Sequence, residues 1–335
     1  RSRPRPPPVV GQVRGPRRDV ARIAAASLVG SLARALYRLS CRAPHWRVGW
    51  RMIDGPGIAE TGDFSGPLFN VLADPGHRFF ADPFPATRDG KTFVFVEDLD
   101  HRVGKGILSA IPFGENGPIG EAVPVLEEPW HLSYPYLIEH DGVLYMIPES
   151  TNARDVALYR CVRFPDRWER VATLLDDLSL SDATVFEHGG RWWMLGTLHD
   201  GEGGWSDVLV VHTAPSLFGP WTPLAENPVL VDRDSARPAG APFLRDGRLW
   251  RPVQDCSAGY GGGLALAEIT RLDEGGYTQV VRHRLAPQPR WPGRKLHTLN
   301  RLGRLEVIDG SVIRPKWSWL AGHVDRACAP REAAP

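Results

Sequence analysis

The sequence predicts an all-β protein: a five-bladed β-propeller of four-stranded blades, preceded by a short, basic and partly helical extension. Three observations predict this fold. The 335 residues include 35 Gly, 31 Pro and 12 Trp, a composition typical of many short strands joined by turns. Helical patterns are scarce after residue 43. A pattern of two apolar strands around a turn that contains Gly then recurs five times, about every fifty residues.

The five copies keep a common register. They begin at Phe80, Leu132, Leu180, Ala236 and Leu296, and their turns contain Gly90, Gly142, Gly190, Gly247 and Gly303. Asp-Gly and Gly-Gly turns favour tight hairpins because they tolerate positive φ. The residues seven positions after the turn glycines are Glu97, Glu149, Thr197, Gln254 and Gly310. A further strand follows each hairpin, so the pattern predicts four-stranded blades near 79–129, 131–177, 178–232, 235–287 and 294–317.

The last copy is short, and the stretch 45–53 predicts the strand that completes it. Pairing this early strand with the last blade closes the ring and removes a free sheet edge. We therefore expect one propeller domain over 44–317, followed by a C-terminal tail over 318–335.

The extension over 1–43 is strongly basic. Residues 1–51 contain twelve Arg and one acid, Asp19. The segment 19–39 predicts a basic amphipathic helix with Val20, Ile23, Leu28, Leu32 and Leu36 near one side. Two interpretations stay open: a poorly ordered tail or a linker from a preceding domain, and a helix that contacts an anionic membrane surface. No apolar run approaches the roughly 18 residues that a membrane span needs.

The four cysteines, Cys41, Cys161, Cys256 and Cys328, stand far apart and form no C-x-x-C pair. This spacing indicates neither a zinc site nor a disulfide framework, and it favours a reducing, cytoplasmic compartment. The basic helix leaves open that the protein also associates with a membrane from that side. No cofactor and no metal are predicted.

Propeller geometry gathers distant residues at one mouth of the central channel. The starts of the first strands contribute Asp82, Tyr134, Asp182, Arg237 and His297. The ends of the second strands contribute Glu97, Glu149, Gln254 and Asp255, with Asp309 as a further candidate. A ring of acids, amides, one Arg and one His suits a polyhydroxylated ligand, because each sugar hydroxyl both donates and accepts hydrogen bonds.

The carboxylates Asp82, Glu149 and Asp182 are the candidate catalytic groups, because glycosidases use one carboxyl to protonate the leaving oxygen and another to activate water or attack the sugar. Structural roles are the alternatives: an Asx turn ahead of Pro83 for Asp82, a strand cap for Asp182 and an exposed turn acid for Glu149.

The other polar residues at this mouth are candidate substrate contacts: Glu97, Tyr134, Arg237, Gln254, Asp255, Tyr260, His297 and Asn300. Arg237 either pairs with the nearby Asp232 or Asp234, or is buried and holds a carboxylate or an anionic ligand. His297 is as well explained by a core histidine as by an acid/base group or metal ligand.

The sequence lacks the motifs of other common catalytic and phosphate-binding sites. The sequence contains no G-x-S-x-G elbow, no P-loop and no H-E-x-x-H, and the glycines from Gly259 precede a strand rather than a helix. Only the Arg-rich extension favours nucleic acid, and it lacks interleaved aromatic residues, so we expect no nucleic-acid partner.

Six ordered motifs carry a family resemblance: FADPF, HLSYPYLIEHDGVLYMIPES, SDATVF, NPVLVDRDSARPAG, RPVQDCSAGYG and LHTLN. Together they resemble the N-terminal domain of plant glucosamine inositolphosphorylceramide transferases, which also occurs in bacteria alone or beside formyltransferase-like modules. The resemblance implies the five-bladed propeller of glycoside hydrolase families 43, 32 and 130.

Compared with family 43, the resemblance implies that Asp82 matches the first-blade base and Asp182 the third-blade Asp that tunes the acid. Arg237 stands where the family has its general acid Glu, so the resemblance leaves Glu149 or Asp255 for that role. In the plant proteins, transfer is attributed to a separate C-terminal domain.

Two functions therefore stay open. The first is a glycosidase-like enzyme that acts on a glycan or glycolipid head group, with Asp82 as base or nucleophile, Glu149 as acid, Asp182 as modulator and Arg237 holding an anionic group. The second is a non-catalytic glycan-binding module that presents a substrate to a partner glycosyltransferase or formyltransferase.

Overall fold

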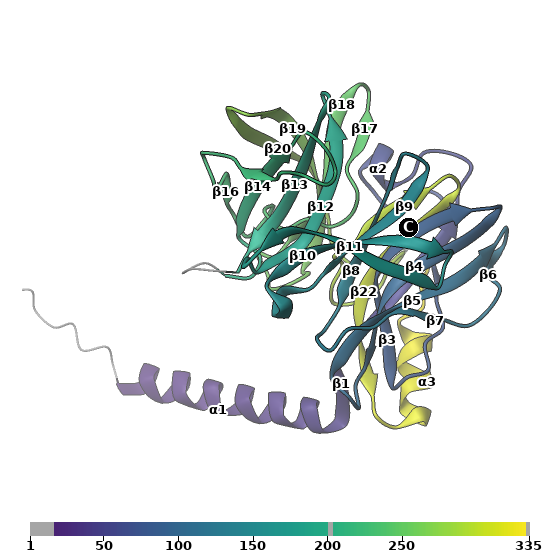
Figure 1. The fold of residues 1–335 in the computed structure, drawn as a ribbon. Coiled ribbons are helices and arrows are strands. Elements are labelled where there is room, and N and C mark those ends of the chain that lie inside the picture. The colour runs from purple at the N-terminus through teal and green to yellow at the C-terminus, as the bar shows by residue number, and fades with distance from the viewer. Residues whose placement is uncertain (1–16, 200–203, 333–335) are drawn as a thin grey trace, which may run out of the picture.

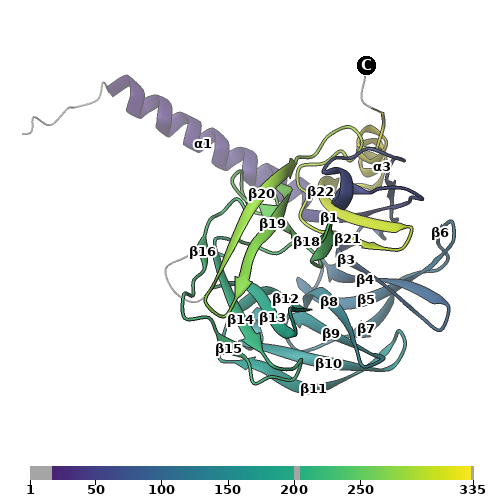
Figure 2. The ribbon, with the colours of Figure 1, turned by 90° about the horizontal axis from the view of Figure 1, so that it is seen from above.

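The computed structural model describes residues 17–199 and 204–332, and over these residues the chain forms a five-bladed β-propeller. Five antiparallel sheets surround a common axis (Figure 2). In two of the blades, a pair of short strands shares the outermost position, so that four strand positions are kept throughout.

The blades follow one another along the chain. Blade 1 comprises β3 (Arg78–Arg88), β4 (Lys91–Asp100), β5 (Lys105–Gly114), β6 (Gly117–Pro118) and β7 (Val123–Leu126). Blade 2 comprises β8 (Ser133–His140), β9 (Val143–Glu149), β10 (Asp155–Arg163) and β11 (Arg167–Asp176). Blade 3 comprises β12 (Leu180–His188), β13 (Arg191–Leu198), β14 (Val208–Ala214), β15 (Thr222–Pro223) and β16 (Leu230–Val231). Blade 4 comprises β17 (Phe243–Arg245), β18 (Arg248–Asp255), β19 (Gly263–Asp273) and β20 (Gly276–Leu285). Blade 5 comprises β21 (Leu299–Leu302), β22 (Leu305–Pro315), β1 (Cys41–Met52) and β2 (Asn70–Val71).

Tight turns form the hairpins that the sequence predicts. In blade 1 the turn residues Asp89 and Gly90 both have positive φ, at 51° and 72°, and the same pattern recurs at Asp141–Gly142 and Asp246–Gly247. Two positive φ values in succession give the twist that matches antiparallel strands. A Cβ at Gly90 would meet no atom within 4 Å, so the backbone conformation, not space, favours glycine there.

Blade 5 is built from both ends of the domain. β1 pairs antiparallel with β22 from Cys41 opposite Pro315 to Met52 opposite Leu305. Within this blade, a buried ion pair joins Arg51 to Glu306 at 2.6 Å. The early strand therefore closes the ring and leaves no open edge between the first and last blades.

The apolar core lies mainly between neighbouring blades. Tyr136 and Ile147 of blade 2 pack in one buried cluster with Val185 and Met194 of blade 3. Five successive residues of β9, Leu144 to Pro148, are buried, so both faces of this strand contribute to the packing. The packing holds the inner strands at fixed positions around the channel.

Helices are few and lie outside the ring. α1 (Arg17–Ser40) covers the predicted helix and projects away from the blades in both views (Figures 1 and 2). The side chains of Leu28, Leu32 and Leu36 are exposed, whereas those of Val20 and Ile23 lie outside the described residues. Among residues 17–199 and 204–332, no helix is both long and apolar enough to cross a membrane.

The predicted C-terminal tail contains a helix. α3 (Ser318–Ala327) follows β22, and its Ala321 is buried. The short helices α2 (Ile58–Thr61) and η1 (Thr151–Ala153) lie in connections.

Candidate functional site: an acidic channel mouth

The inner strands of blades 1, 2 and 3 share an unusual backbone feature. Asp82, Tyr134 and Asp182 stand at equivalent positions and have φ values of 50°, 42° and 53°. The pairing register shifts at each of them, as in a β-bulge. Positive φ at residues other than Gly costs roughly 1–3 kcal/mol each and clusters at functional sites. The bulges thus mark one end of the channel.

A carboxylate from a neighbouring blade accepts a hydrogen bond from each bulged N–H group. The N–H of Asp82 donates to Oδ2 of Asp309 in blade 5 at 2.8 Å. The N–H of Tyr134 donates to Oδ2 of Asp82 at 3.2 Å, and that of Asp182 donates to Oε2 of Glu149 at 3.1 Å. The acids therefore connect blades 5, 1, 2 and 3 in sequence, and a residue far along the chain supplies each connection.

Asp82 lies at the centre of one buried cluster. Its side chain is almost fully enclosed, and Oδ1 accepts a hydrogen bond from Oγ1 of Thr298 at 2.8 Å. His297 Nδ1 lies 3.7 Å from the same oxygen and 2.8 Å from Oδ1 of Asp309. Burial raises the pKa of Asp82 to about 6, although the nearby His297 opposes this shift. This carboxyl therefore titrates near neutrality.

His297 is held between acids and an aromatic ring. Burial alone would lower its pKa, but Asp309 and Asp82 outweigh burial and raise the pKa above 6.5. Its ring stacks on Trp46 with 3.8 Å between centroids. Trp46 belongs to the closing strand β1, so the same pairing that closes the propeller also builds the mouth.

Asp182, Arg237 and Glu149 form a second cluster. The Arg237 side chain donates from Nε to Oδ2 of Asp182 at 2.6 Å, and its Nη2 lies 3.5 Å from Oε2 of Glu149. Gln254 Nε2 donates to the same oxygen of Asp182 at 3.0 Å. Burial raises the pKa of Asp182 to about 7; Arg237 opposes the shift and Glu149 adds to it.

The partners of Arg237 answer a question that the sequence left open. The guanidinium is 6% exposed and pairs with Asp182 and Glu149 across blades, not with the local Asp232 or Asp234. Its remaining Nη1 donates to the carbonyl of Trp205 at 2.9 Å. Because the protein's own carboxylates bind this guanidinium, the main role of Arg237 is to hold two acids together.

Glu97 is buried beside both clusters. It is 8% exposed, and within the described part of the chain its one ion-pair partner is His131, whose Nε2 lies 3.4 Å from Oε1. Burial raises the pKa of Glu97 well above its usual 4.5, and the nearby Asp82 and Glu149 raise it further. The sequence placed this residue among the substrate contacts.

Two other predicted contacts, Tyr134 and Asn300, have structural partners. The Tyr134 hydroxyl contacts Oγ1 of Thr184 and accepts a hydrogen bond from the N–H of Gly240. Asn300 accepts from the N–H of Ala241 and donates to the carbonyl of Pro83. Both side chains join inner strands of different blades.

Asp255 turns away from Gln254. Its carboxylate accepts from Nη1 of Arg284 at 2.6 Å and from Ser257, and these donors lower its pKa against the effect of burial. Successive residues of a strand point to opposite faces, so when Gln254 reaches Asp182, Asp255 faces the other side of β18.

Tyr260 and Lys295 cover the clusters. The Tyr260 ring lies 4.8 Å from the guanidinium carbon of Arg237, and Lys295 Nζ lies 5.3 Å from the same ring. The Tyr260 residue is 41% exposed, yet burial of its hydroxyl raises its pKa well above 10. Tyr260 therefore has one surface towards solvent and one towards the acids, an arrangement that suits sugar stacking.

Sequence reasoning missed Trp46, Thr298 and Lys295. Thr298 and Lys295 flank the predicted Leu296 and His297, so their neighbourhood was visible in the sequence. Trp46 had no motif to reveal it, because its contact with His297 depends on how the ring closes.

Asp82, His297 and Asp309 place possible ligand atoms within 4.8 Å of one another. However, Nδ1 of His297 and Oδ1 of Asp309 contact each other, and this oxygen also accepts from the N–H groups of His297 and Thr298. These atoms suit a hydrogen-bonded relay better than an open coordination sphere.

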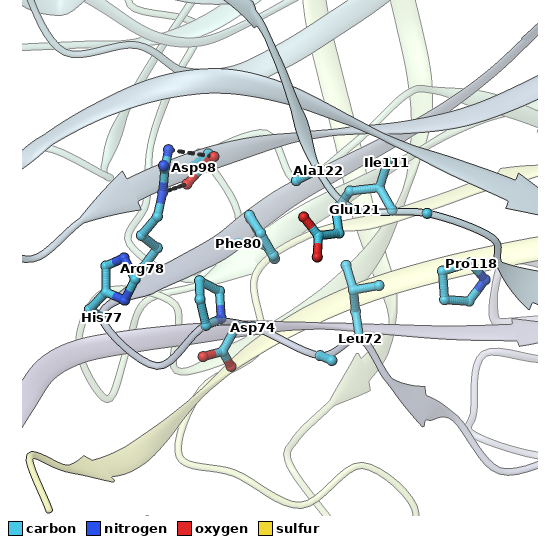
Figure 3. Close-up of a pocket in the computed structure, with 13 residues that line it drawn as sticks. Leu72, Asp74, His77, Arg78, Phe80, Asp98, Ile111, Pro118, Glu121 and Ala122 are labelled. Carbon is cyan, nitrogen blue, oxygen red and sulfur yellow. Dashed lines mark hydrogen bonds and ion pairs between the residues drawn. The ribbon is translucent and has the colours of Figure 1, made fainter. Parts of the chain in front are cut away.

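A separate cavity of about 570 Å³ lies between blades 5 and 1 (Figure 3). Leu72 and Phe80 form part of its wall, with the ion pair of Arg78 and Asp98 and the carboxylate of Glu121 beside them. Asp98 follows Glu97 in β4, so the two side chains point to opposite faces of the strand and the cavity lies apart from the acidic mouth.

The ring of blades and its acidic mouth define a class, the five-bladed β-propellers with the fold of glycoside hydrolases. Zg3597, a family 117 glycoside hydrolase from Zobellia galactanivorans, matches with a TM-score of 0.51 and 11% identity over 86% of this chain and 99% of that chain. The catalytic domain of the Coprinopsis cinerea family 62 α-L-arabinofuranosidase matches with a TM-score of 0.51 and 13% identity, over 71% of this chain and 83% of that chain. At these identities the similarity establishes the fold alone.

The sequence itself establishes the family. Residues 71–310, more than half of the chain, match the family "Glucosamine inositolphosphorylceramide transferase 1, N-terminal", and the chain belongs to this family. Glucosamine inositolphosphorylceramide transferase 1 of Arabidopsis thaliana is 33% identical over 61% of this chain and 27% of its own length. The protein of the same name from Oryza sativa subsp. indica is 28% identical over 70% of this chain and 34% of its own length. The matches thus cover about a third or less of these relatives.

Proposed function

We propose that the chain is a glycosidase-like propeller that acts on a glycan or glycolipid head group through acid/base chemistry at the channel mouth. One observation carries the proposal: Asp82 and Asp182 stand at equivalent bulged positions, are buried, and have pKa values raised to about 6 and about 7. Carboxyl groups that titrate near neutrality suit general acid/base catalysis at physiological pH.

In this proposal Asp82 is the base that activates water. Thr298 and the N–H of Tyr134 fix the orientation of its carboxylate. Asp182 modulates the site together with Arg237, while Gln254 and Tyr260 contact the sugar. Glu149, the acid expected from the sequence, accepts a hydrogen bond from the N–H of Asp182 and pairs with Arg237. These contacts favour a fixed, charged partner of Arg237 over a mobile proton donor.

A glycan-array screen followed by product analysis tests this function. We expect purified protein to bind a defined group of glycans or glycolipid head groups and to cleave at least one of them into two products separable by mass spectrometry. Heat-unfolded protein is the control. Binding to glycans without product from any bound compound would contradict the enzymatic proposal.

A non-catalytic glycan-binding module is the second candidate. The observation that favours it is how fully the acids are bound by the protein's own donors, since Asp82, Asp182 and Asp309 each accept at least two hydrogen bonds. The remaining length of the plant relatives also leaves room for a partner domain. In this case the mouth presents a substrate, and binding in the screen would occur without product.

We further propose that α1 contacts an anionic membrane surface. Leu28, Leu32 and Leu36 lie one helical turn apart and are 74%, 61% and 57% exposed, and Arg22 and Arg38 are exposed on the same helix. Co-sedimentation with phosphatidylserine vesicles tests this contact. We expect Leu32→Glu to reduce binding strongly, whereas binding equal to the wild type, or equal binding to neutral vesicles, would contradict it.

A further inference from the structure

We propose that Glu97, at the end of β4, is the group that donates a proton to the leaving oxygen. The inference rests on the proposed glycosidase function and changes the role that the sequence suggested for Glu97 and for Glu149. It follows from the hydrogen bonds that the five carboxyl groups of the mouth accept.

Four of the five carboxyl groups are committed to donors in the protein. Asp82 accepts from Thr298 and the N–H of Tyr134, and Asp309 accepts from the N–H groups of Asp82 and Thr298. Asp182 accepts from Arg237 and Gln254, and Glu149 accepts from the N–H of Asp182 and faces Arg237. Each of these four groups accepts at least one hydrogen bond from a backbone N–H group or faces a cationic side chain, and such donors favour the ionised form of a carboxyl group.

Glu97 is bound differently. Its Oε1 lies 3.4 Å from Nε2 of His131, and within the described residues its carboxyl group accepts no hydrogen bond from a backbone N–H group and pairs with no Arg or Lys side chain. The carboxyl group is buried and surrounded by Asp82, Glu149, Asp309 and Asp182, and this environment opposes a further negative charge. A buried carboxyl group among other acids keeps its proton, as the general acid of a glycosidase must.

His131 determines which oxygen of Glu97 carries the proton. Its Nδ1 accepts a hydrogen bond from the N–H of Gly106 at 2.9 Å. Because Nδ1 accepts this hydrogen bond, the ring proton lies on Nε2, the nitrogen nearest to Oε1 of Glu97. Burial also lowers the pKa of His131, which favours the neutral ring. Because Oε1 faces a donor, we place the Glu97 proton on Oε2. His131 is therefore a positioning residue.

Gly106 leaves room for the side chain of His131. A Cβ at Gly106 would come within 2.6 Å of the carbonyl oxygen of Leu132 and 2.7 Å of Cε1 of His131. Only glycine lets the backbone of β5 approach His131 closely enough for the 2.9 Å hydrogen bond.

The proposed step balances with water as the second reactant. Glu97 transfers its proton to the glycosidic oxygen as the bond from that oxygen to the anomeric carbon breaks, and the bonding electrons stay on the oxygen. A water oxygen forms the new bond to the anomeric carbon while Asp82 takes one of its protons. Exchange with solvent then returns a proton to Glu97 and removes one from Asp82.

The acidity of the leaving group distinguishes a general acid at Glu97 from a residue with only a structural role. An aryl glycoside whose phenol is acidic needs no proton at its leaving oxygen, whereas the glycoside found in the screen does. We expect Glu97→Gln to slow hydrolysis of the glycoside by about 10²-fold or more but to leave the matching aryl glycoside within about tenfold. Glu139→Gln, which changes an exposed acid of β8, is the control and should affect neither substrate.

The variant Glu149→Gln tests the alternative that Glu149 is the general acid. If Glu149→Gln produces the loss that depends on the leaving group and Glu97→Gln does not, Glu149 is the acid and the inference is wrong. If the wild type hydrolyses neither substrate, the proposed function fails, and the proton on Glu97 is tested by spectroscopy instead.

Infrared difference spectra need no substrate. At pH 7 the wild type minus Glu97→Gln should show the carbonyl stretch of a protonated carboxyl group. A carboxylate band in its place would overturn the inference. If Glu97→Gln does not fold, Glu97→Asp and a ¹³C-edited spectrum of labelled wild-type Glu residues give the same test.

Discussion

The inner strands of blades 1 to 3 differ from those of blades 4 and 5 although the repeat aligns all five. In blades 1 to 3 the strand opens with a bulged residue at positive φ, and its N–H bonds to a carboxylate of another blade. In blades 4 and 5 the equivalent residues are Arg237 and His297, which have no positive φ. The segment before β17 instead contacts β21, and the N–H of Leu299 donates to the carbonyl of Ala239 at 2.8 Å.

At these five equivalent positions the difference separates acids from cations, although blade 5 also contributes the acid Asp309 from β22. The bulged side contributes Asp82 and Asp182, and the other side contributes Arg237 and His297 as their counter-charges. The repeat of the blades therefore determines where the first-strand residue lies, whereas the charge of its side chain differs from blade to blade. The asymmetry provides a titratable acid on one side of a ligand and an organising cation on the other.

Removing the closing strand should have the largest effect. Deletion of residues 1–40 removes only α1 and the residues before it, and we expect the melting temperature to change by only a few degrees. Deletion through Met52 removes β1, which pairs with β22 and supplies the buried Trp46 and Val48, and we expect cooperative unfolding to be lost. Circular dichroism melts of both deletions test this; equal melting temperatures would show that another strand closes the ring.

Breaking the charge contact between the two sides should have the next largest effect on stability. Arg237→Met leaves the buried Asp182 and the partly buried Glu149 without their cation, and we expect a loss of about 3–5 kcal/mol in the free energy of unfolding. Urea denaturation measures it. The exposed pair of Arg160 and Glu169 provides the control, because Arg160→Met should have a far smaller effect. Equal losses in the two variants would contradict the organising role of Arg237.

Removing one donor to Asp82 should have the smallest effect and shift a pH profile. The Thr298 hydroxyl bonds to Oδ1 of Asp82 and lowers its pKa, so Thr298→Val should raise that pKa above about 6. Because the base must be ionised, the acidic limb of the rate against pH should move to higher pH. Thr270→Val, at an exposed hydroxyl of β19, should leave the limb in place. An unchanged or lowered limb in Thr298→Val would exclude Asp82 as its source.

The sequence predicts the blades because their turns are local. Asp-Gly and Gly-Gly pairs favour positive φ wherever they occur, and four such hairpins and a fifth with a single Gly, all at one spacing, leave little choice of fold. The alignment of Asp82, Tyr134 and Asp182 follows from the same register. Opposite faces for Gln254 and Asp255 were also predictable, since neighbouring strand residues alternate.

Contacts between blades were beyond sequence reasoning. Asp82 and Tyr134 adopt positive φ although neither is a glycine, so the sequence does not predict this conformation. Their conformation accompanies the hydrogen bonds from their N–H groups to carboxylates of other blades. Arg237 had acids nearby in the chain, yet it pairs with two from other blades. The stacking of Trp46 on His297 likewise depends on ring closure.

Asp82→Asn tests the central claim, acid/base catalysis at this mouth, most directly. Asn tolerates positive φ and keeps the shape of the side chain but cannot take a proton. With a glycan from the screen, we expect turnover to fall by at least about 10²-fold while binding stays within about tenfold, because only a transition-state interaction is lost. Asp89→Asn, at an exposed turn with φ of 51°, is the matched control and should retain full turnover. Unchanged turnover in Asp82→Asn would contradict the account.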